Sequence, residues 1–236
     1  MAVNNEIGSI QPIQAISELL ADKPTISFHV DAVQALAKIP TEKYLTDRVD
    51  FATFSGHKFH GVRGVGFVYI KSGKKITPLL TGGGQERDYR STTENVPGIA
   101  ATAKALRLSM EKLDFFTSKT GQMKTVIRQA LLDYPDIFVF SDEEDFAPHI
   151  LTFGIKGVRG EVIVHAFEDY DIFISTTSAC SSKAGKPAGT LIAMGVDKDK
   201  AQSAVRLSLD LENDMSQVEQ FLTKLKLIYN QTRKVR

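Results

Sequence analysis

Cysteine is nearly absent from this chain, because Cys180 is the single cysteine among 236 residues. One cysteine cannot close an internal disulfide bond, and it cannot supply a zinc site built on two or four cysteines. A reducing, intracellular compartment fits such a sequence best. No apolar run approaches the ~18 residues that span a bilayer, and the first residues have neither the basic nor the apolar region of a signal peptide. We therefore expect a cytoplasmic protein with no membrane segment and no metal site.

An excess of charge of either sign is also absent. Lys and Arg number 29 and Asp and Glu number 28, so the formal net charge is +1. This balance leaves no electrostatic reason to expect nucleic acid or an anionic membrane as the main partner. Apolar residues make up 42% and charged residues 24%, which is ordinary globular composition.

Helix-like and strand-like patterns alternate along the first half of the chain. Ile and Leu recur at helical spacing over residues 11–21. Short β-rich runs predict strands at residues 25–30, 49–54 and 64–70, with a short helical stretch after Asp31 to Ala37. Asn95 and Pro97 predict the start of a helix that runs to about residue 113. The alternation favours an α/β fold.

The second half of the chain is expected to form a smaller α+β unit. Helices are expected at residues 117–134, 160–170, 187–194 and 216–231, and strands at 137–140, 149–155, 171–174 and 204–209. A polar loop is expected over 175–187. A boundary near residue 113 therefore divides the chain into domains 1–113 and 114–236.

Three glycine or histidine motifs are present but lack the residues that would make them sites. Gly61, Gly64 and Gly66 are in the wrong order for a dinucleotide fingerprint and precede a strand. The glycines of residues 82–84 lack the Gly-Lys-Ser/Thr of a phosphate loop. His57-x-x-His60 has no third ligand nearby, so we expect no metal.

Two predicted strands end in residues that carry chemistry. Asp31 closes one strand, and Lys58 follows the end of another. Ligands of open α/β sheets bind beyond the carboxyl ends of the strands, so an acid and a lysine placed there would face one ligand. The alternative is that Asp31 caps the following helix and that Lys58 is solvated.

Cys180 is surrounded by small polar residues, with Lys183 and Lys186 nearby. Lowering the pKa of a thiol by one unit from ~8.5 needs only about 1.4 kcal/mol of extra thiolate stabilisation. A reactive thiol in an exposed loop is one interpretation, and a small buried apolar residue is the other.

Seven strings, in order from end to end, resemble one family. They are Asn4-Asn5-Glu6-Ile7-Gly8 with Gln11-Pro12-Ile13, His29-Val30-Asp31-Ala32-Val33-Gln34, Ser55-Gly56-His57-Lys58-Phe59, Gly82-Gly83-Gly84-Gln85-Glu86-Arg87, Arg90-Ser91-Thr92-Thr93-Glu94-Asn95, Ser178-Ala179-Cys180-Ser181-Ser182 and Arg206-Leu207-Ser208-Leu209. The chain is similar to the cysteine desulfurases, which supply sulfur for iron–sulfur clusters and tRNA thiolation. These are pyridoxal-phosphate enzymes of the class V aminotransferase group and the aspartate-aminotransferase fold type. The residues around Cys180 resemble the subgroup with a flexible cysteine loop.

The resemblance implies a site for pyridoxal 5'-phosphate. Lys58 would form the Schiff base with the cofactor aldehyde, and Asp31 would pair with the protonated pyridine nitrogen. The other cofactor contacts that the family implies are Gln34 on the ring hydroxyl oxygen, Ser55 and His57 on the phosphate, Thr93 on the phosphate of the other subunit, and Asn5.

The resemblance also implies the reaction. Asn5 and Arg206 would hold the carboxylate of L-cysteine. Lys58 would take the α-proton, and the Cys180 thiolate would take the substrate sulfur as a persulfide while alanine leaves. Lys58, Cys180 and His57 are thus the expected catalytic residues. A homodimer and a sulfur acceptor protein, either a cluster scaffold or a tRNA-thiolation enzyme, are the expected partners.

The chain departs from the family pattern in several places. Only Met1, Ala2 and Val3 precede the first string, where family members carry roughly a further third of a chain. An incomplete large domain, weak cofactor binding and little activity are therefore expected. Asp88 and Thr92 stand where the family often has glycine, and Asp tolerates a positive φ better than Thr does.

Two other functions fit the same sequence. One is a selenocysteine lyase or another class V aminotransferase-like enzyme, which a required Cys180 would argue against. The other is a non-catalytic dimerisation or docking fragment, which the lack of a cofactor spectrum would favour.

Overall fold

The computed structural model describes residues 1–142, 144–177 and 189–234. The chain divides into two compact units, residues 1–2 with 11–113 and residues 3–10 with 114–236. The sequence-based boundary placed residues 3–10 in the first domain, but they belong to the second unit. Main-chain hydrogen bonds explain this difference, because the Ile10 N–H donates to the Asp145 carbonyl (2.6 Å) and the Ala147 N–H donates to the Gly8 carbonyl (2.7 Å).

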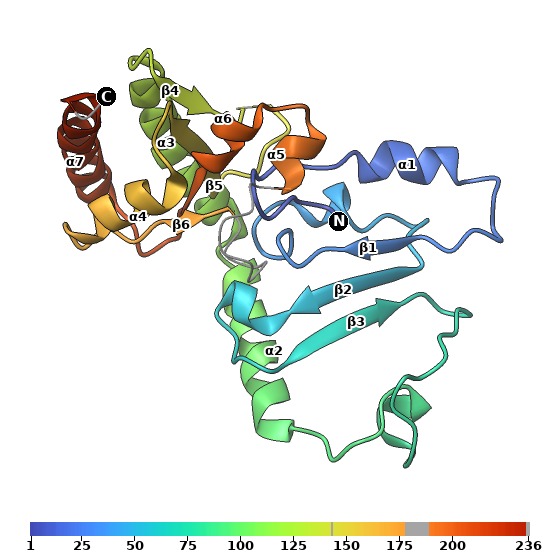
Figure 1. Cartoon of the computed structure of the whole chain (residues 1–236). Helices are drawn as coiled ribbons and strands as arrows, with labels where there is room; N and C mark the ends of the chain where they lie inside the picture. The colour runs from blue at the N-terminus through green and yellow to red at the C-terminus, as the bar shows by residue number, and fades with distance from the viewer. Residues whose placement is uncertain (143, 178–188, 235–236) are drawn as a thin grey trace. The chain divides into compact units, whose positions relative to one another are not determined.

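The first unit is built on a three-stranded sheet (Figure 1). Its elements are α1 (Ile13–Leu19), β1 (His29–Asp31), η1 (Thr41–Lys43), β2 (Phe51–Ser55), η2 (Gly56–Phe59), β3 (Gly66–Ile70), η3 (Gln85–Asp88) and α2 (Val96–Met110). The strand order is β1-β2-β3, with β1 parallel to β2 and β3 antiparallel to it. The strand expected at 25–30 is confined to β1, so its predicted start was wrong.

The helical stretch expected after Asp31 is also wrong, because this segment forms hydrogen-bonded turns. Leu36 N–H donates to the Ala32 carbonyl over 3.1 Å, as in one turn of helix. Ala37 then takes a φ of 57°, which is outside the right-handed helical region and ends the turn.

Local signals place two of the elements of the first unit. Along β2, Ala52 and Phe54 are buried while the alternate residues are half-buried, which is the period of a strand. The Asn95 side chain accepts a hydrogen bond from the Gly98 N–H over 3.1 Å, so the predicted cap of α2 is confirmed.

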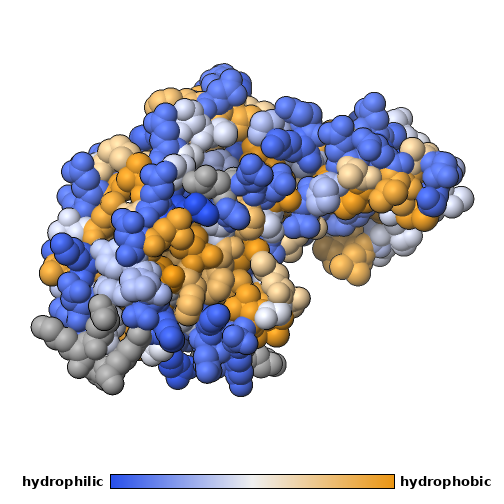
Figure 2. Space-filling model, turned by 90° about the horizontal axis from the view of Figure 1, so that it is seen from above, coloured by the Kyte–Doolittle hydropathy of each residue, from blue (hydrophilic) through white to orange (hydrophobic). Residues whose placement is uncertain are grey.

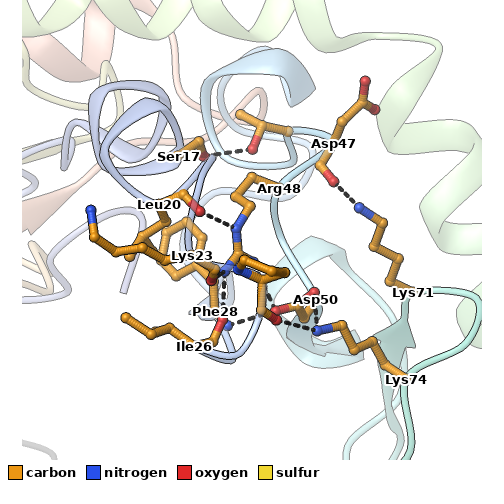
Figure 3. Close-up of polar contacts among 12 residues, drawn as sticks. Ser17, Leu20, Lys23, Ile26, Phe28, Asp47, Arg48, Asp50, Lys71 and Lys74 are labelled. Carbon is orange, nitrogen blue, oxygen red and sulfur yellow. Dashed lines mark hydrogen bonds and ion pairs between the residues drawn. The ribbon is translucent and has the colours of Figure 1, made fainter.

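A buried carboxylate joins three segments of the first unit (Figure 3). The side chain of Asp50 is 2% exposed and accepts from the Phe28 N–H (2.8 Å) and from Arg48 (2.9 Å), and Lys74 lies 3.2 Å away. Burial by itself would raise the pKa of Asp50, but these donors and the positive charge of Lys74 lower that pKa below its usual value of 3.8.

The second unit contains a four-stranded antiparallel sheet with helices packed on it (Figure 1). Its elements are α3 (Leu113–Leu132), β4 (Ile137–Val139), β5 (Ile150–Ile155), α4 (Gly160–Glu168), β6 (Ser175–Thr176), α5 (Gly189–Ala193), α6 (Lys198–Gln202), β7 (Val205–Ser208) and α7 (Met215–Lys234). The strand order is β4-β5-β7-β6. Its apolar core includes Phe167 stacked on Phe221, with ring centroids 5.0 Å apart.

The strand expected at 171–174 is wrong. Asp171 has a φ of 58°, and the Ile172 N–H donates to the Phe167 carbonyl, so this segment is the turn that follows α4. The strand is β6, which pairs Ser175 with Arg206 of β7. The sequence analysis did not predict α6.

The surface carries exposed apolar residues, some of them in groups. Figure 2 shows orange hydrophobic residues that touch one another, with blue hydrophilic residues around them, on the face seen from above. Leu79 of the first unit and Phe173 of the second are 94% and 79% exposed, and the consecutive residues Phe67, Val68 and Tyr69 of β3 are 41%, 44% and 37% exposed. Within the described part of the chain, no helix combines the length and the apolar character needed to span a bilayer.

We predict that Asp50→Asn lowers the free energy of unfolding by about 3 kcal/mol at pH 7, because it leaves two cations around a neutral amide. The folded-state pKa of Asp50 is depressed, so the contribution is complete above pH 3.8 and is lost as the pH falls below that value. Urea unfolding between pH 7 and pH 3 should therefore show the two proteins converging. The exposed Asp22→Asn is the control, and a pH-independent gap would contradict this account.

Candidate functional site

Two predicted site residues lie at one edge of the first sheet. β1 and β2 are parallel, and Asp31 is in register with Thr53, two residues before Ser55. Residues in register face the same side of a sheet, so Asp31, Thr53 and Ser55 share one face. By strand geometry the Cα atoms of Asp31 and Ser55 are about 8 Å apart. The His29 ring lies 3.2 Å from the Thr53 hydroxyl and also joins the two strands on this face.

The turn that carries His57 and Lys58 is closely packed. Its Gly56 N–H donates to the Val65 carbonyl, and the Gly61 N–H donates to the Gly56 carbonyl, both over 2.9 Å. A Cβ on Gly56 would lie 2.9 Å from the Thr102 methyl of α2 and 2.9 Å from the Val65 carbonyl oxygen. Only glycine fits this position, so α2 fixes where the turn presents its side chains.

The side chains of this edge are available to a ligand. Asp31 and His57 are exposed, and Gln34, Ser55 and Lys58 are half-buried. The Lys58 amine makes no hydrogen bond or ion pair with any residue that the structure describes. The Asp31 carboxylate accepts from the Val33 N–H over 3.0 Å. The alternative that Asp31 caps the segment after it is thus also observed, although the carboxylate keeps further lone pairs.

The loop that carries Thr93 has an unusual backbone. Glu86, Arg87 and Asp88 have φ values of 50°, 56° and 66°. Asp88, where the family often has glycine, thus has a positive φ, whereas Thr92 is not among the residues with positive φ. Thr93 itself is exposed.

The remaining predicted residues lie in the second unit, where Asn5 and Arg206 meet. Arg206 of β7 donates from Nη1 to the Asn5 carbonyl over 2.7 Å. Its strand neighbour in register, Thr152 of β5, donates from its hydroxyl to the Glu6 carbonyl over 2.6 Å. Ser141 donates to the Ile7 carbonyl over 2.6 Å. Three consecutive carbonyls are thus held by side chains of the second unit.

The sequence analysis missed the residues that fix this segment. Thr152 and Ser141 are 0% and 1% exposed, and neither belongs to a string that indicated a site. Gly8 takes a φ of +83°, and a Cβ there would lie 2.9 Å from the Ile150 Cβ. Gly8 and Glu6 do belong to the first string, which was the available signal.

Two further predictions concern Cys180 and metals. Cys180 and most of the polar loop expected at 175–187 lie outside the described residues. Among the residues that the structure describes, no group of three His, Cys, Asp or Glu side chains could hold a metal ion.

Comparison with known proteins assigns the family. The sequence profile of the family described as Aminotransferase class-V matches residues 1–221. The chain belongs to this family. A "NifS/IcsS protein homolog" from Lactobacillus delbrueckii subsp. bulgaricus is 50% identical over 100% of this class V chain, which covers 61% of that protein. A "Cysteine desulfurase IscS" from Clostridium botulinum is 36% identical over 100% of the chain, which covers 59% of that relative.

The fold of this class V chain also has solved counterparts. A structure named "NIFS-LIKE PROTEIN" superposes with a TM-score of 0.87 at 36% identity, over 98% of this chain and 60% of that one. The α/β fold of the pyridoxal-phosphate-dependent transferases expected from the sequence is therefore confirmed. The chain spans about 60% of the length of these relatives.

We predict that Gly56→Ala destabilises the first unit of this class V chain by about 1–3 kcal/mol, because its Cβ would press on a backbone oxygen and on α2. Urea unfolding measures the change. Gly121→Ala is the matched control, since the nearest atom to its Cβ would be 3.8 Å away. It should be neutral or stabilising because Gly121 is inside α3. Equal stability of both variants would contradict the packing described for the turn.

Proposed function

We propose that the chain carries the cofactor and substrate residues of a cysteine desulfurase, which converts L-cysteine to L-alanine and holds the sulfur on Cys180. The observation that supports this most is the edge where Asp31 and Ser55 end two parallel strands and His57 and Lys58 follow directly. The family and the printed names of the relatives support the same reaction.

The residues at this edge fit pyridoxal 5'-phosphate by their chemistry. When bound, this cofactor supplies an electron-poor ring that accepts the electron pair freed at the substrate α-carbon. The Asp31 carboxylate would hold the protonated ring nitrogen, and the Lys58 amine would bond the aldehyde carbon. Ser55 and His57 would donate hydrogen bonds to the phosphate. Gln34 would donate one to the ring hydroxyl oxygen.

Other residues would act on the substrate and on the second subunit. The Arg206 guanidinium, held by the Asn5 carbonyl, would bind the carboxylate of L-cysteine through two parallel hydrogen bonds. Asn5 would assist this binding and contact the cofactor. Thr93, which is exposed, would reach the phosphate of a second copy in a homodimer.

Lys58 would transfer the proton, and Cys180 would take the sulfur. The amine of L-cysteine would replace the Lys58 amine on the aldehyde carbon, and the freed, neutral Lys58 amine would then remove the α-proton. The Cys180 thiolate would attack the substrate sulfur, forming an S–S bond as the C–S bond breaks. The electron pair of the C–S bond stays with carbon, which takes up a proton to give alanine. A sulfur acceptor protein, such as a cluster scaffold or a tRNA-thiolation enzyme, would then collect the persulfide sulfur.

We predict that pyridoxal phosphate bonds selectively to Lys58. After incubation with the cofactor and reduction with borohydride, mass spectrometry should place the adduct on Lys58, and Lys58→Ala should lose it. The control Lys75→Ala removes an exposed lysine of the same unit and should leave the adduct unchanged. An adduct spread evenly over several lysines would contradict the proposal.

The variant Cys180→Ser distinguishes the proposed desulfurase from a selenocysteine lyase and from a docking fragment. With cofactor bound on Lys58, alanine release from L-cysteine should fall to background in Cys180→Ser, as measured by chromatography of the free amino acids. A selenocysteine lyase would still release alanine from selenocysteine in that variant. A docking fragment would release none in either protein, although it could retain its partner.

A further inference from the structure

A cavity of about 360 Å³ lies in the second unit, where the end of β7 and the first turns of α7 line it. This volume is at the lower end of the range for ligand sites and suits one large side chain. Among the described residues that line it, the charged ones are Asp171 and Asp214, and none is a cation. Its floor consists of buried apolar residues, which are Ile127, Leu207, Leu209, Val218 and Phe221.

The cavity forms where two strands part. β6 pairs with β7 at Ser175, which is in register with Arg206. The same register would pair residues 172–174 with residues 207–209, but in the described chain these two segments form no ladder with each other and line the cavity instead. One reason is that the Ile172 N–H is used by the turn after α4, where it donates to the Phe167 carbonyl over 3.1 Å.

The parting of the strands leaves main-chain groups of β7 open. The Leu209 N–H donates to the His149 carbonyl over 2.9 Å, so Leu209 and Leu207 direct their main-chain groups toward β5. Ser208, between them, therefore directs its N–H and C=O away from β5, on the side where residues 172–174 leave the ladder. An open strand edge of this kind accepts an extended peptide.

The segments that bring Asp171 and Asp214 to the cavity are acidic. Residues 168–171 read Glu-Asp-Tyr-Asp and residues 210–214 read Asp-Leu-Glu-Asn-Asp, so each segment has three carboxylates. The formal net charge of the chain is +1, so this density of negative charge is local. Basic side chains that contact these segments include His165, Lys119 and Lys224. Of these three, His165 alone is paired with a carboxylate. A complementary ligand therefore combines an apolar group with positive charge.

We propose that the cavity is the docking site for an extended segment of a partner protein, in which a large apolar residue is flanked by lysine or arginine. The apolar side chain fills the cavity, the cations face Asp171 and Asp214, and the main chain bonds to Ser208. Phe173 lines the cavity and is 79% exposed. It packs on the bound segment, as a few aromatic side chains commonly do at the centre of an interface. The proposal goes beyond the proposed function and does not depend on it.

The first test uses three fluorescein-labelled hexapeptides and the full chain, with binding measured by fluorescence anisotropy. The peptide KKLFKK should bind saturably. The peptides EELFEE and KKGGKK should bind at least about tenfold more weakly, because one lacks the cations and the other lacks the apolar anchor. Equal binding of KKGGKK would overturn the proposal, because the site would then be an acidic surface without a pocket. Equal binding of EELFEE, or no saturable binding of KKLFKK, would also overturn it.

Variants place the binding at this cavity. Phe173→Ser should weaken KKLFKK by about fivefold or more. The double variant Asp171→Asn with Asp214→Asn should weaken it by about threefold or more and reduce its salt dependence. Asn at position 214 still caps α7, where the side chain of Asp214 accepts from the Gln217 N–H. The matched controls are Leu132→Ser, 56% exposed on α3, and the exposed Asp199→Asn on α6. Wild-type affinity in either cavity variant would overturn the proposal.

Two further measurements decide the mode of binding and the occupant. Saturating KKLFKK should slow hydrogen exchange of the Ser208 amide and leave the Phe138 amide of β4, at the opposite edge of the sheet, unchanged. Unchanged exchange at Ser208 would overturn the proposed strand addition. Sedimentation of the chain without peptide tests a second copy as the occupant. A dimer that Phe173→Ser dissociates would assign the cavity to that second copy and overturn the partner segment.

Discussion

The parallel pairing of β1 with β2 is the contact on which the candidate cofactor site depends. It brings the ends of two strands to one edge, so that Asp31 and Ser55 face the same side. Gly56 then turns the chain so tightly against α2 that His57 and Lys58 follow at a fixed place. The backbone alone therefore places an acid, a hydroxyl, an imidazole and an amine at one edge of the sheet.

In the second unit, side chains that are distant in the sequence hold a short N-terminal segment. Side chains of Ser141, Thr152 and Arg206 each take one carbonyl of residues 5–7. Buried hydroxyl groups need hydrogen-bond partners. The hydroxyls of Ser141 and Thr152 donate to the carbonyls of Ile7 and Glu6, which belong to no strand. The same turn also contacts α5, where the Thr190 N–H donates to the Glu6 carboxylate over 3.2 Å.

Local signals were sufficient for much of this structure. The cap of α2 was predictable because Asn95 is a favourable N-cap residue and Pro97 suits the first turn of a helix. Asp88 has a positive φ at a position where the family often has glycine. The strand expected at 171–174 failed because Asp171 adopts a left-handed conformation that β-rich composition does not reveal. Two features arise from tertiary pairing, which no residue spacing in a single sequence encodes. They are the membership of residues 3–10 in the second unit and the contact of Glu6 with Thr190.

The central claim is that the β1–β2 edge binds pyridoxal phosphate. The affinity of the chain for pyridoxal phosphate tests this claim most directly. An absorbance titration of the chain with pyridoxal phosphate should show binding that Asp31→Ala weakens by about tenfold or more, since the pyridinium nitrogen loses its counter-charge. Asp22→Ala, at an exposed position outside the strands, should bind as the wild type does. Equal affinity in the wild type and Asp31→Ala would contradict the account.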